Sequence, residues 1–393
     1  MPEVVTAGDF GRRWRAFYLI GVIFGQLFSY YIQMFIKNQK IKISENVFCD
    51  NFQNPWFVTL IMTIGMSYSS IIYLIKSHKS KDPDPKFSKI PLSQYLHAFL
   101  LAVTDIIYSF LYVSSNMQNS SLSLILVRIF IIFFVIIFET FYMKKKLYKY
   151  VIFSAVLIYI GLIISGIAIG FTLKKTDFKN NIWIVIAIQI IAQALWAFKS
   201  IKEEQLLKNN DITPVWLCAV EGIYEFLIIL FIIYPIINFL PDKFSKNFIF
   251  KESLCNSFRI VFHSWTLIIT FFFYTFLLCF YNISLLGTKF MYSAAKYLVL
   301  DTVVAQTIRW VLDLIIYYST LGKLETGKTL GIEWNKWSFV RLIGVIILVI
   351  GAAFYTKIIR LKCFEYEDPD VSIIKMNNDY ESSGVVKECL VNI

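Results

Sequence analysis

Long apolar stretches follow one another along almost the whole chain, and only short polar segments separate them. An apolar run of about 20 residues is what an α-helix needs to cross a bilayer. A membrane β-barrel would instead alternate apolar and polar positions, and the sequence lacks that alternation. The pattern predicts an all-α membrane protein with ten transmembrane helices, at residues 16–36, 56–75, 92–113, 121–143, 150–172, 181–201, 215–240, 261–284, 290–318 and 338–359.

The two ends of the chain are polar and are predicted to lie on the same side, because ten crossings are an even number. Residues 1–15 form a short segment before a first run that is too long for a signal peptide. Residues 363–393 are polar and mixed in charge, which predicts a disordered tail. The loops on the terminal side carry more Lys and Arg than the opposite loops, so both termini are expected in the cytosol.

Composition agrees with a membrane protein. Hydrophobic residues make up 57% of the chain and charged residues 17%, against about 25% charged in soluble domains. The net charge of +11 is assigned to loops beside lipid headgroups, with no nucleic-acid partner. Cys49 and Cys255 fall in loops on the side away from the cytosol, so a disulfide between them is one alternative and two free thiols is the favoured one.

A weak internal repeat relates the fourth and ninth predicted helices. Each begins after a short polar turn with a hydroxyl residue followed eight positions later by a cation. The pairs are Ser120 with Arg128 and Thr288 with Lys296.

Two five-helix halves follow from this repeat, at residues 16–172 and 181–359. Since five crossings are an odd number, the second half must be inverted relative to the first, as in transporters whose site lies between inverted repeats. The fifth and tenth helices carry spaced glycines that would also allow a homodimer. These glycines are Gly161, Gly166, Gly170, Gly344 and Gly351.

Ionisable residues inside membrane helices cost about 2.5–3.5 kcal/mol each on insertion scales and are candidate functional residues. They are Asp105, Arg128, Glu221, Glu225, Lys296, Asp301, Arg309 and Asp313. Arg128 and Lys296 occupy matching places in the two halves and could bind an anionic substrate, although Arg128 could instead pair with Asp105. Arg309 and Asp313 are spaced for a local salt bridge.

Asp105 lies in the apolar stretch AVTDIIY, where burial would let it carry a proton during transport. Glu221 invites the same interpretation, and a structural hydrogen bond is the alternative for both. Gln26 and Gln193 could line the same cavity, or join helices as polar contacts. Four further charged residues lie near cytosolic helix ends and are expected to reach water: Glu139, Lys199, Glu203 and Glu204.

Three stretches resemble the drug/metabolite transporter superfamily, namely residues 102–134, 191–226 and 282–310. Within it they are most similar to the F-type branch of the nucleotide-sugar-transporter-like solute carrier family 35, which is related to chloroquine-resistance-transporter-like proteins. The resemblance implies ten helices in two inverted repeats and alternating access with no bound cofactor. It also implies that Asp105, Arg128, Gln193, Glu221 and Lys296 occupy family positions, although Lys296 stands where an arginine is expected.

An enzyme is not expected. The three histidines do not cluster at metal-ligand spacing, and no G-x-S-x-G turn occurs. The stretch GKLETGKT at 322–329 matches a P-loop, but it follows a predicted membrane helix rather than a strand, so an exposed turn is favoured.

The sequence thus predicts a secondary transporter of a small, anionic organic metabolite in an internal membrane, such as that of the Golgi, endoplasmic reticulum, lysosome or vacuole. Amino acids, peptides or drug-like cations as substrates, and a non-transporting scaffold, are the alternatives.

Overall fold

A computed structural model describes residues 7–38, 41–44, 47–49, 52, 54–79, 90–118, 121–172, 182–210, 212–239, 252–319 and 331–366. These residues are almost entirely helical. The first half contains α1 (Ala7–Asn38), α2 (Pro55–Ser67), α3 (Ser69–Lys79), α4 (Leu92–Gln118), α5 (Ser121–Tyr142) and α6 (Lys149–Thr172). The second half contains α7 (Ile182–Asn209), α8 (Pro214–Ile228), a π-helical turn (Ile229–Ile233), α9 (Tyr234–Phe239), α10 (Leu254–Phe262), α11 (Trp265–Met291), α12 (Ala294–Gln306), α13 (Ile308–Ser319) and α14 (Lys336–Tyr355).

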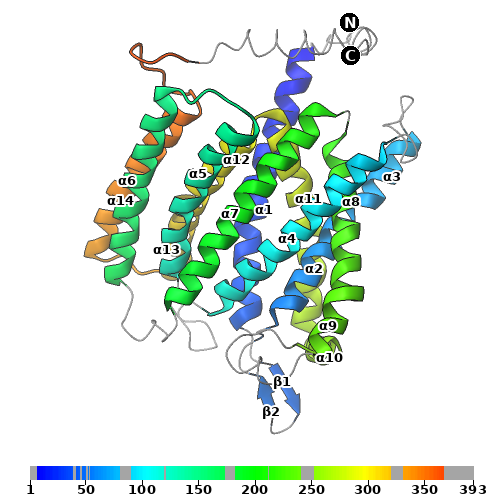
Figure 1. Cartoon of the computed structure of the whole chain (residues 1–393). Helices are drawn as coiled ribbons and strands as arrows, with labels where there is room; N and C mark the ends of the chain where they lie inside the picture. The colour runs from blue at the N-terminus through cyan, green and yellow to red at the C-terminus, as the bar shows by residue number, and fades with distance from the viewer. Residues whose placement is uncertain are drawn as a thin grey trace, which may run out of the picture.

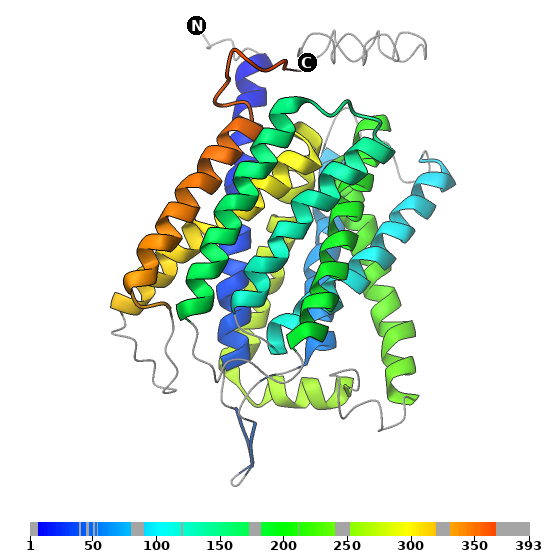
Figure 2. The same ribbon diagram turned by 60° about the vertical axis from the view of Figure 1, so that its left-hand side comes forward.

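The long helices form one bundle with two distinct ends (Figure 1). The start of α1 and the finish of α14 lie at the same end, here called the terminal end. At the opposite, hairpin end, β1 (Ile41–Ser44) and β2 (Val47–Cys49) form an antiparallel pair. The short helix α10 lies across the hairpin end, at a steep angle to the bundle (Figure 2). The hairpin was not predicted, and it stands outside the apolar helices.

Each helix of the first half packs against a helix of the second half. The contacts join α1 to α11, α2 to α8, α4 to α7 and α8, α5 to α7 and α12, and α6 to α14. The bundle core therefore lies between the halves.

Seven helical segments are long and apolar enough to cross a membrane, among the residues described. Large apolar side chains point outward from them, for example Phe273 on α11, Ile163 on α6 and Ile343 on α14. Monomeric soluble proteins rarely expose apolar surface on this scale. The chain is therefore an all-α, multi-pass membrane protein.

Three of the ten predicted crossings are not among these seven. The apolar beginnings of α5 and α7 lie outside the residues whose side chains are described. The predicted ninth helix is broken at Thr307 into α12 and α13, each shorter than a bilayer crossing. The number ten and the inverted repeat remain predictions.

The predicted boundary between the eighth and ninth helices is wrong. Residues 285–289 were expected to form a connection, but α11 continues to Met291 and the turn consists of Tyr292 and Ser293. Lys289, assigned from the sequence to a loop, lies in the helix with its side chain fully buried. Its ammonium group pairs with the buried carboxylate of Glu203, and this partner explains why the helix can include a lysine there.

Three glycines of the fifth and tenth predicted helices lie in the contact between α6 and α14, namely Gly161, Gly344 and Gly351. A Cβ atom on Gly161 would stand 2.6 Å from the carbonyl oxygen of Gly344, and one on Gly351 would stand 2.9 Å from Ile158. These glycines thus serve packing within one chain. The homodimer through these helices stays a prediction.

Two further predictions lie outside the described residues. One is the GKLETGKT turn, and the other is most of the C-terminal tail, beyond residue 366. The element before that turn is α13, a helix, as expected.

Candidate functional site

A polar cavity lies between the two halves, with an empty volume of about 990 Å³ that includes its open mouth. Its walls come from α1, α2, α4, α7, α8, α11, α12 and α13. The residues from α1 belong to the half of that helix nearer the hairpin end, and those from α4 and α11 lie near mid-helix. The cavity therefore occupies the middle of the bundle and extends toward the hairpin end.

The cavity wall contains several charged and aromatic side chains. The ionisable acids and base are Asp105, Glu225, Asp301 and Arg309. The aromatic residues are Tyr30, Tyr108, Tyr112, Trp196, Tyr281 and Tyr297. The wall thus contains three carboxyl groups and one guanidinium.

Lys199 on α7 joins three carboxylates in the protein interior. Its Nζ lies 3.0 Å from Asp105 on α4, 3.1 Å from Glu203 one turn further along α7, and 3.2 Å from Glu221 on α8. Glu203 also pairs with Lys289 on α11. All five side chains are less than 10% exposed. The ion pairs therefore hold α4, α7, α8 and α11 together. In a buried region, removing one partner of an ion pair strongly destabilises the fold.

Glu225 stands one helical turn after Glu221, on the same face of α8. Its carboxyl group lies within hydrogen-bonding reach of that of Asp105, and its buried Oε1 accepts no hydrogen bond from an N–H or hydroxyl donor of the described residues. Both residues of this contact line the cavity.

An aromatic layer separates the cavity from Lys289. The rings of Tyr108 and Trp196 stack with centroids 4.6 Å apart, and the Tyr281 and Tyr297 hydroxyls lie 3.2 Å apart. Lys289 Nζ lies 4.7 Å from the centre of the Trp196 ring and 5.2 Å from that of Tyr297. The layer covers the cavity on the side of the terminal end.

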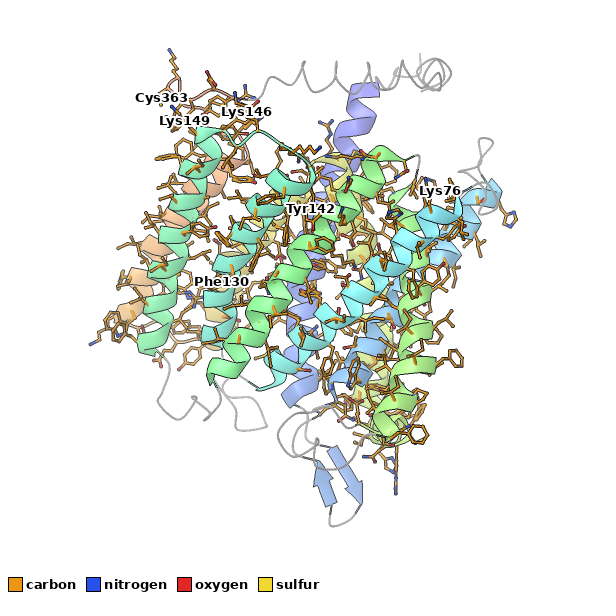
Figure 3. The ribbon with its side chains drawn as sticks, viewed as in Figure 1. Lys76, Phe130, Tyr142, Lys146, Lys149 and Cys363 are labelled. Carbon is orange, nitrogen blue, oxygen red and sulfur yellow. The ribbon has the colours of Figure 1, made fainter. Side chains whose placement is uncertain are left out.

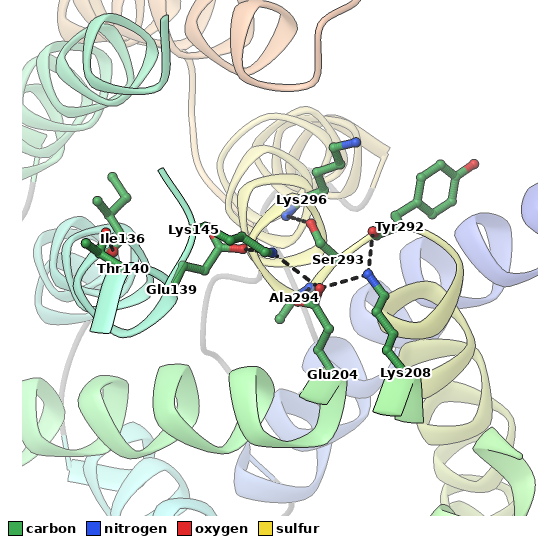
Figure 4. A network of polar contacts seen from close by, with 10 residues as sticks. All are labelled: Ile136, Glu139, Thr140, Lys145, Glu204, Lys208, Tyr292, Ser293, Ala294 and Lys296. Atoms are coloured by element: carbon green, nitrogen blue, oxygen red, sulfur yellow. Dashed lines mark hydrogen bonds and ion pairs between the residues drawn. The ribbon is translucent and has the colours of Figure 1, made fainter. Parts of the chain in front are cut away.

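A second polar network lies nearer the terminal end and is centred on Glu204 (Figure 4). Glu204 accepts hydrogen bonds from Lys208 at 2.8 Å and from the backbone N–H of Ala294, the first residue of α12, at 2.7 Å. Lys145, between α5 and α6, lies 3.4 Å away. A carboxylate at a helix N-terminus is favoured by the unpaired N–H groups there.

The lysines of this network extend it to further elements. Lys208 donates to the carbonyl of Tyr292 at 3.1 Å, and Lys145 pairs with Glu139 at 2.7 Å. Burial alone would lower the pKa of Lys145, but the carboxylates of Glu139 and Glu204 outweigh it and raise that pKa above its ordinary value. The network links the α5–α6 connection, α7 and the α11–α12 turn.

The predicted site residues fall into two groups. Asp105 and Gln26 line the cavity, and Gln26 donates to the carbonyl of Asp301 at 3.2 Å. Glu221 and Gln193 are buried, and Glu221 binds Lys199.

Of the two predicted substrate cations, only Lys296 has a described side chain. Lys296 is half-buried on the first turn of α12 and is absent from the cavity wall, and its side chain points away from the Glu204 network (Figure 4). Arg128 lies in α5, but its side chain is outside the described residues. Asp105 pairs with Lys199, and the pairing with Arg128 considered from the sequence lies outside the described side chains.

Three residues expected to reach water are instead buried: Lys199, Glu203 and Glu204. The expectation was wrong because position near a helix end does not reveal which face of the helix is covered. A signal did exist, since Gln189, Gln193, Trp196, Ser200 and Glu203 recur at intervals of three or four and mark one polar stripe on α7.

The predicted local salt bridge between Arg309 and Asp313 is replaced by contacts with α1. The Arg309 guanidinium lies 4.1 Å from the centre of the Tyr30 ring, and Asp313 accepts a hydrogen bond of 2.9 Å from Tyr31. Both residues thus join the two halves.

At the hairpin end, the buried carboxylate of Glu252 caps a helix that is distant in sequence. It accepts hydrogen bonds from the backbone N–H groups of Trp56 and Phe57 in the first turn of α2, at 2.9 and 3.0 Å. Tyr234 and Ser257 donate to the same carboxylate at 3.2 and 2.9 Å. Burial raises the pKa of Glu252 to about 7, more than these four donors lower it.

The fold and this site define a class: a multi-pass helical membrane protein with a charged cavity between its two halves. The chain is 24% identical over 320 residues to solute carrier family 35 member F6 of Rattus norvegicus, covering 79% of this chain and 80% of the relative. The Homo sapiens protein of that name is 24% identical over 321 residues, with the same coverage. These likenesses are distant, and they confirm the resemblance to solute carrier family 35 inferred from the motifs.

Two other comparisons add little. No protein-family model matches the chain. A solved chain described as "Crystal structure of protein" aligns at a TM-score of 0.43 with 14% identity, covering 87% of this chain and 97% of that one. That score is too low to define the fold.

Proposed function

We propose that this protein is a secondary transporter that moves a small organic solute across a membrane by alternating access between halves 16–172 and 181–359. The charged cavity between the halves is the observation that carries the proposal, because buried charges are costly in a membrane protein and mark substrate or ion pathways. The name of its relatives, solute carrier, supports the same class.

The pattern of helix contacts supports the inverted repeat. Suppose that the helices of the two halves correspond in order: α1 to α7, α2–α3 to α8–α9, α4 to α11, α5 to α12–α13 and α6 to α14. Exchanging the halves then turns the contact of α1 with α11 into that of α7 with α4. The contact of α4 with α8 likewise becomes that of α11 with α2, and the contact of α5 with α6 becomes that of α12 with α14. Such exchange is what two inverted repeats require.

An anionic substrate held by Arg128 and Lys296 stays a prediction from the sequence. The described cavity favours the other alternative, an organic amine or an amino-acid-like solute. Asp105, Glu225 and Asp301 would attract a positive group, and six aromatic rings offer faces to a cation. Arg309 could receive a carboxylate if the solute carries both charges.

The orientation is proposed from the loops. Lys76, Lys146 and Lys149 are exposed at the terminal end (Figure 3). Positive loops favour the cytosolic side, so both termini are placed there. An internal membrane remains the proposed location.

A thermal-shift screen of the purified protein tests the substrate class. Organic amines, amino acids, nucleotide-sugars, nucleotides and organic acids are compared, and a solute at 100 times its Kd stabilises by about 2.7 kcal/mol. Amines or amino acids are expected to stabilise the protein and to enter proteoliposomes. Stabilisation by nucleotide-sugars alone would restore the anionic alternative, and a lack of uptake for every binder would favour a scaffold.

Two matched variants locate the binding site. Asp301→Asn removes a carboxylate that lines the cavity and is expected to weaken the binding of the amine roughly 10-fold, the effect of about 1.4 kcal/mol. Asp313→Asn removes a carboxylate from the next helix that does not line it and is expected to leave the Kd unchanged. Equal effects of the two changes would place the amine elsewhere.

A further inference from the structure

The buried cluster around Lys199 contains more acids than bases. Its carboxyl groups belong to Asp105, Glu203, Glu221 and Glu225, and its ammonium groups to Lys199 and Lys289. If every group were ionised, the cluster would carry two negative charges that no described cation of the cluster balances. An isolated charge in such surroundings is neutralised by binding a proton or another cation.

The geometry shows which carboxyl group is left without a cation. A lysine ammonium has three donor hydrogens, and Lys199 meets three carboxylates, those of Asp105, Glu203 and Glu221. Glu225 is not among them. Its contact is the carboxyl group of Asp105.

Two carboxyl groups can hydrogen-bond each other only when one of them is protonated, because an ionised carboxylate has acceptors and no donor. Asp105 already binds the ammonium of Lys199 at 3.0 Å and is therefore the carboxylate of the pair. Glu225 is the acid that donates.

We propose that the Asp105–Glu225 pair is a proton-binding site whose proton is taken up from, and released to, water in the cavity. The proposal rests on the transport function proposed above and assigns it a coupling ion. On release, the Glu225 O–H bond breaks, the proton passes to a water molecule in the cavity, and Glu225 becomes a carboxylate. Uptake reverses these steps after the cavity opens to the other side of the membrane.

The surroundings of the pair are otherwise poor in groups that could supply a counter-charge. The ionisable groups that adjoin it or share its cavity wall include Lys199, Glu203, Cys218, Glu221, Lys289, Asp301 and Arg309. The helix α2, which packs against α8, has no ionisable side chain. The two lysines are engaged by carboxylates and the Arg309 guanidinium lies against the Tyr30 ring, so deprotonating Glu225 adds a charge that a cation entering the cavity would balance.

A proton is favoured over a metal ion. Among the described residues, no group of three or more His, Cys, Asp or Glu side chains is arranged to hold a metal ion. A proton requires only the two carboxyl oxygens that already meet.

Infrared difference spectroscopy of the purified full-length protein tests the site without requiring transport. The comparison is made in a Glu252→Gln background, because Glu252 would give a band of its own. The protein with Glu225 is expected to show a protonated-carboxyl band that disappears as the pH is raised and is absent once Glu225→Gln is added. Glu204→Gln is the control, because Glu204 is equally buried but receives three donors, and it should keep the band. A band that persists in Glu225→Gln would overturn the proposal.

A second variant and a salt titration complete the test of the site. Where Glu225→Gln does not fold, Asp105→Asn is measured instead, since removing the acceptor should shift the Glu225 band. A shift of the melting temperature with sodium or potassium at constant pH and ionic strength, absent from Glu225→Gln, would assign the site to an inorganic cation and overturn the proton site.

Proteoliposomes separate this inference from the proposed function. A pH gradient is expected to drive accumulation of the solute by the wild type, whereas any transport that Glu225→Gln keeps should not respond to the gradient. Wild-type transport that ignores the gradient would overturn the coupling. A protein that moves no solute at all would refute the transport function, while the infrared result still decides whether the pair holds a proton.

Discussion

Lys199 is the single cation on which three buried carboxylates depend. Replacing it with methionine would leave Asp105, Glu203 and Glu221 without that partner while keeping a side chain of similar length. We expect Lys199→Met to destabilise the protein by about 3–5 kcal/mol, the usual cost of removing one partner of a buried ion pair. Thermal unfolding in detergent measures the change.

The control lies on the same helix. Lys202 is partly buried, donates to Gln205 at 3.1 Å and covers the Tyr142 ring, so Lys202→Met should cost less than about 1 kcal/mol. Adding Glu221→Gln to Lys199→Met should recover part of the loss, because one unpaired charge disappears. Equal effects of the two lysine changes would show that the buried cluster contributes no special stability.

Glu252 is expected to make stability depend on pH near neutrality. Its pKa of about 7 in the folded protein lies above its ordinary value of 4.5, so the folded state favours the protonated acid. The stabilising contribution is complete below about pH 4.5 and is lost as the pH rises through 7. Over that range the loss amounts to roughly 3 kcal/mol.

The melting temperature measured from pH 5 to pH 8 checks this expectation. It should fall with rising pH in the wild type and fall less in Glu252→Gln, which resembles the protonated acid in size and charge. The same pH dependence in both proteins would show that other groups cause it.

The sequence was informative about residue types and less so about their partners. It singled out Asp105, Glu221 and Glu225 because a charge in an apolar run is unusual. It could not place Lys199 or Lys289 in the interior, because each lies near the end of a run, where a long side chain usually reaches water.

The contact between α6 and α14 depends on glycine. A Cβ atom on Gly161 would meet the backbone of Gly344 and Leu348 at 2.6 Å, and backbone atoms cannot move aside as a side chain can. We expect Gly161→Val to separate the two helices and to destabilise the protein by about 1–3 kcal/mol, the range for overpacking. Ile160→Val, at an exposed position next to it, is the control and should have little effect.

The rate of proteolysis of the purified protein measures whether α6 and α14 have separated. Loops joined to α6 and α14 should be cut faster in Gly161→Val than in the wild type. Unchanged rates of cleavage and an unchanged melting temperature would mean that the helices tolerate the larger side chain.

Helices were easier to predict than their breaks. The apolar runs predicted the long helices because a segment that crosses a bilayer must be long, hydrophobic and hydrogen-bonded within itself. The break at Thr307 and the extension of α11 through Lys289 are set by neighbours from other helices, which a local pattern does not contain. Sequence periodicity therefore located most helices and misplaced some of their ends.

The polar cavity and the Glu204 network together describe a molecule closed at its terminal end. Aromatic rings and two layers of ion pairs lie between the cavity and that end. Alternating access requires this closure to open. The contacts of Glu204 with Lys145, Lys208 and the N-terminus of α12 are the ones that would have to break.

Glu204→Gln is accordingly expected to favour opening at the terminal end. In a variant with its native cysteines replaced and Ser109→Cys in the cavity wall, a membrane-impermeant thiol reagent applied from the terminal end should react several-fold faster when Glu204→Gln is present. Lys202→Gln on the same helix is the control. A rate that is unchanged by Glu204→Gln would remove this carboxylate from the closure.

The sequence alone was enough to establish an all-helical membrane protein and its resemblance to solute carrier family 35, because hydrophobic run length and short motifs are local properties. Only the tertiary structure decided which charges meet. Asp105, Lys199, Glu221 and Lys289 come from four different helices, and their ion pairs form because tertiary packing brings these helices together. The same packing puts three acids in the cavity wall and leaves the described side chain of Lys296 out of it, and the proposal of an amine or amino-acid-like solute rests on that arrangement.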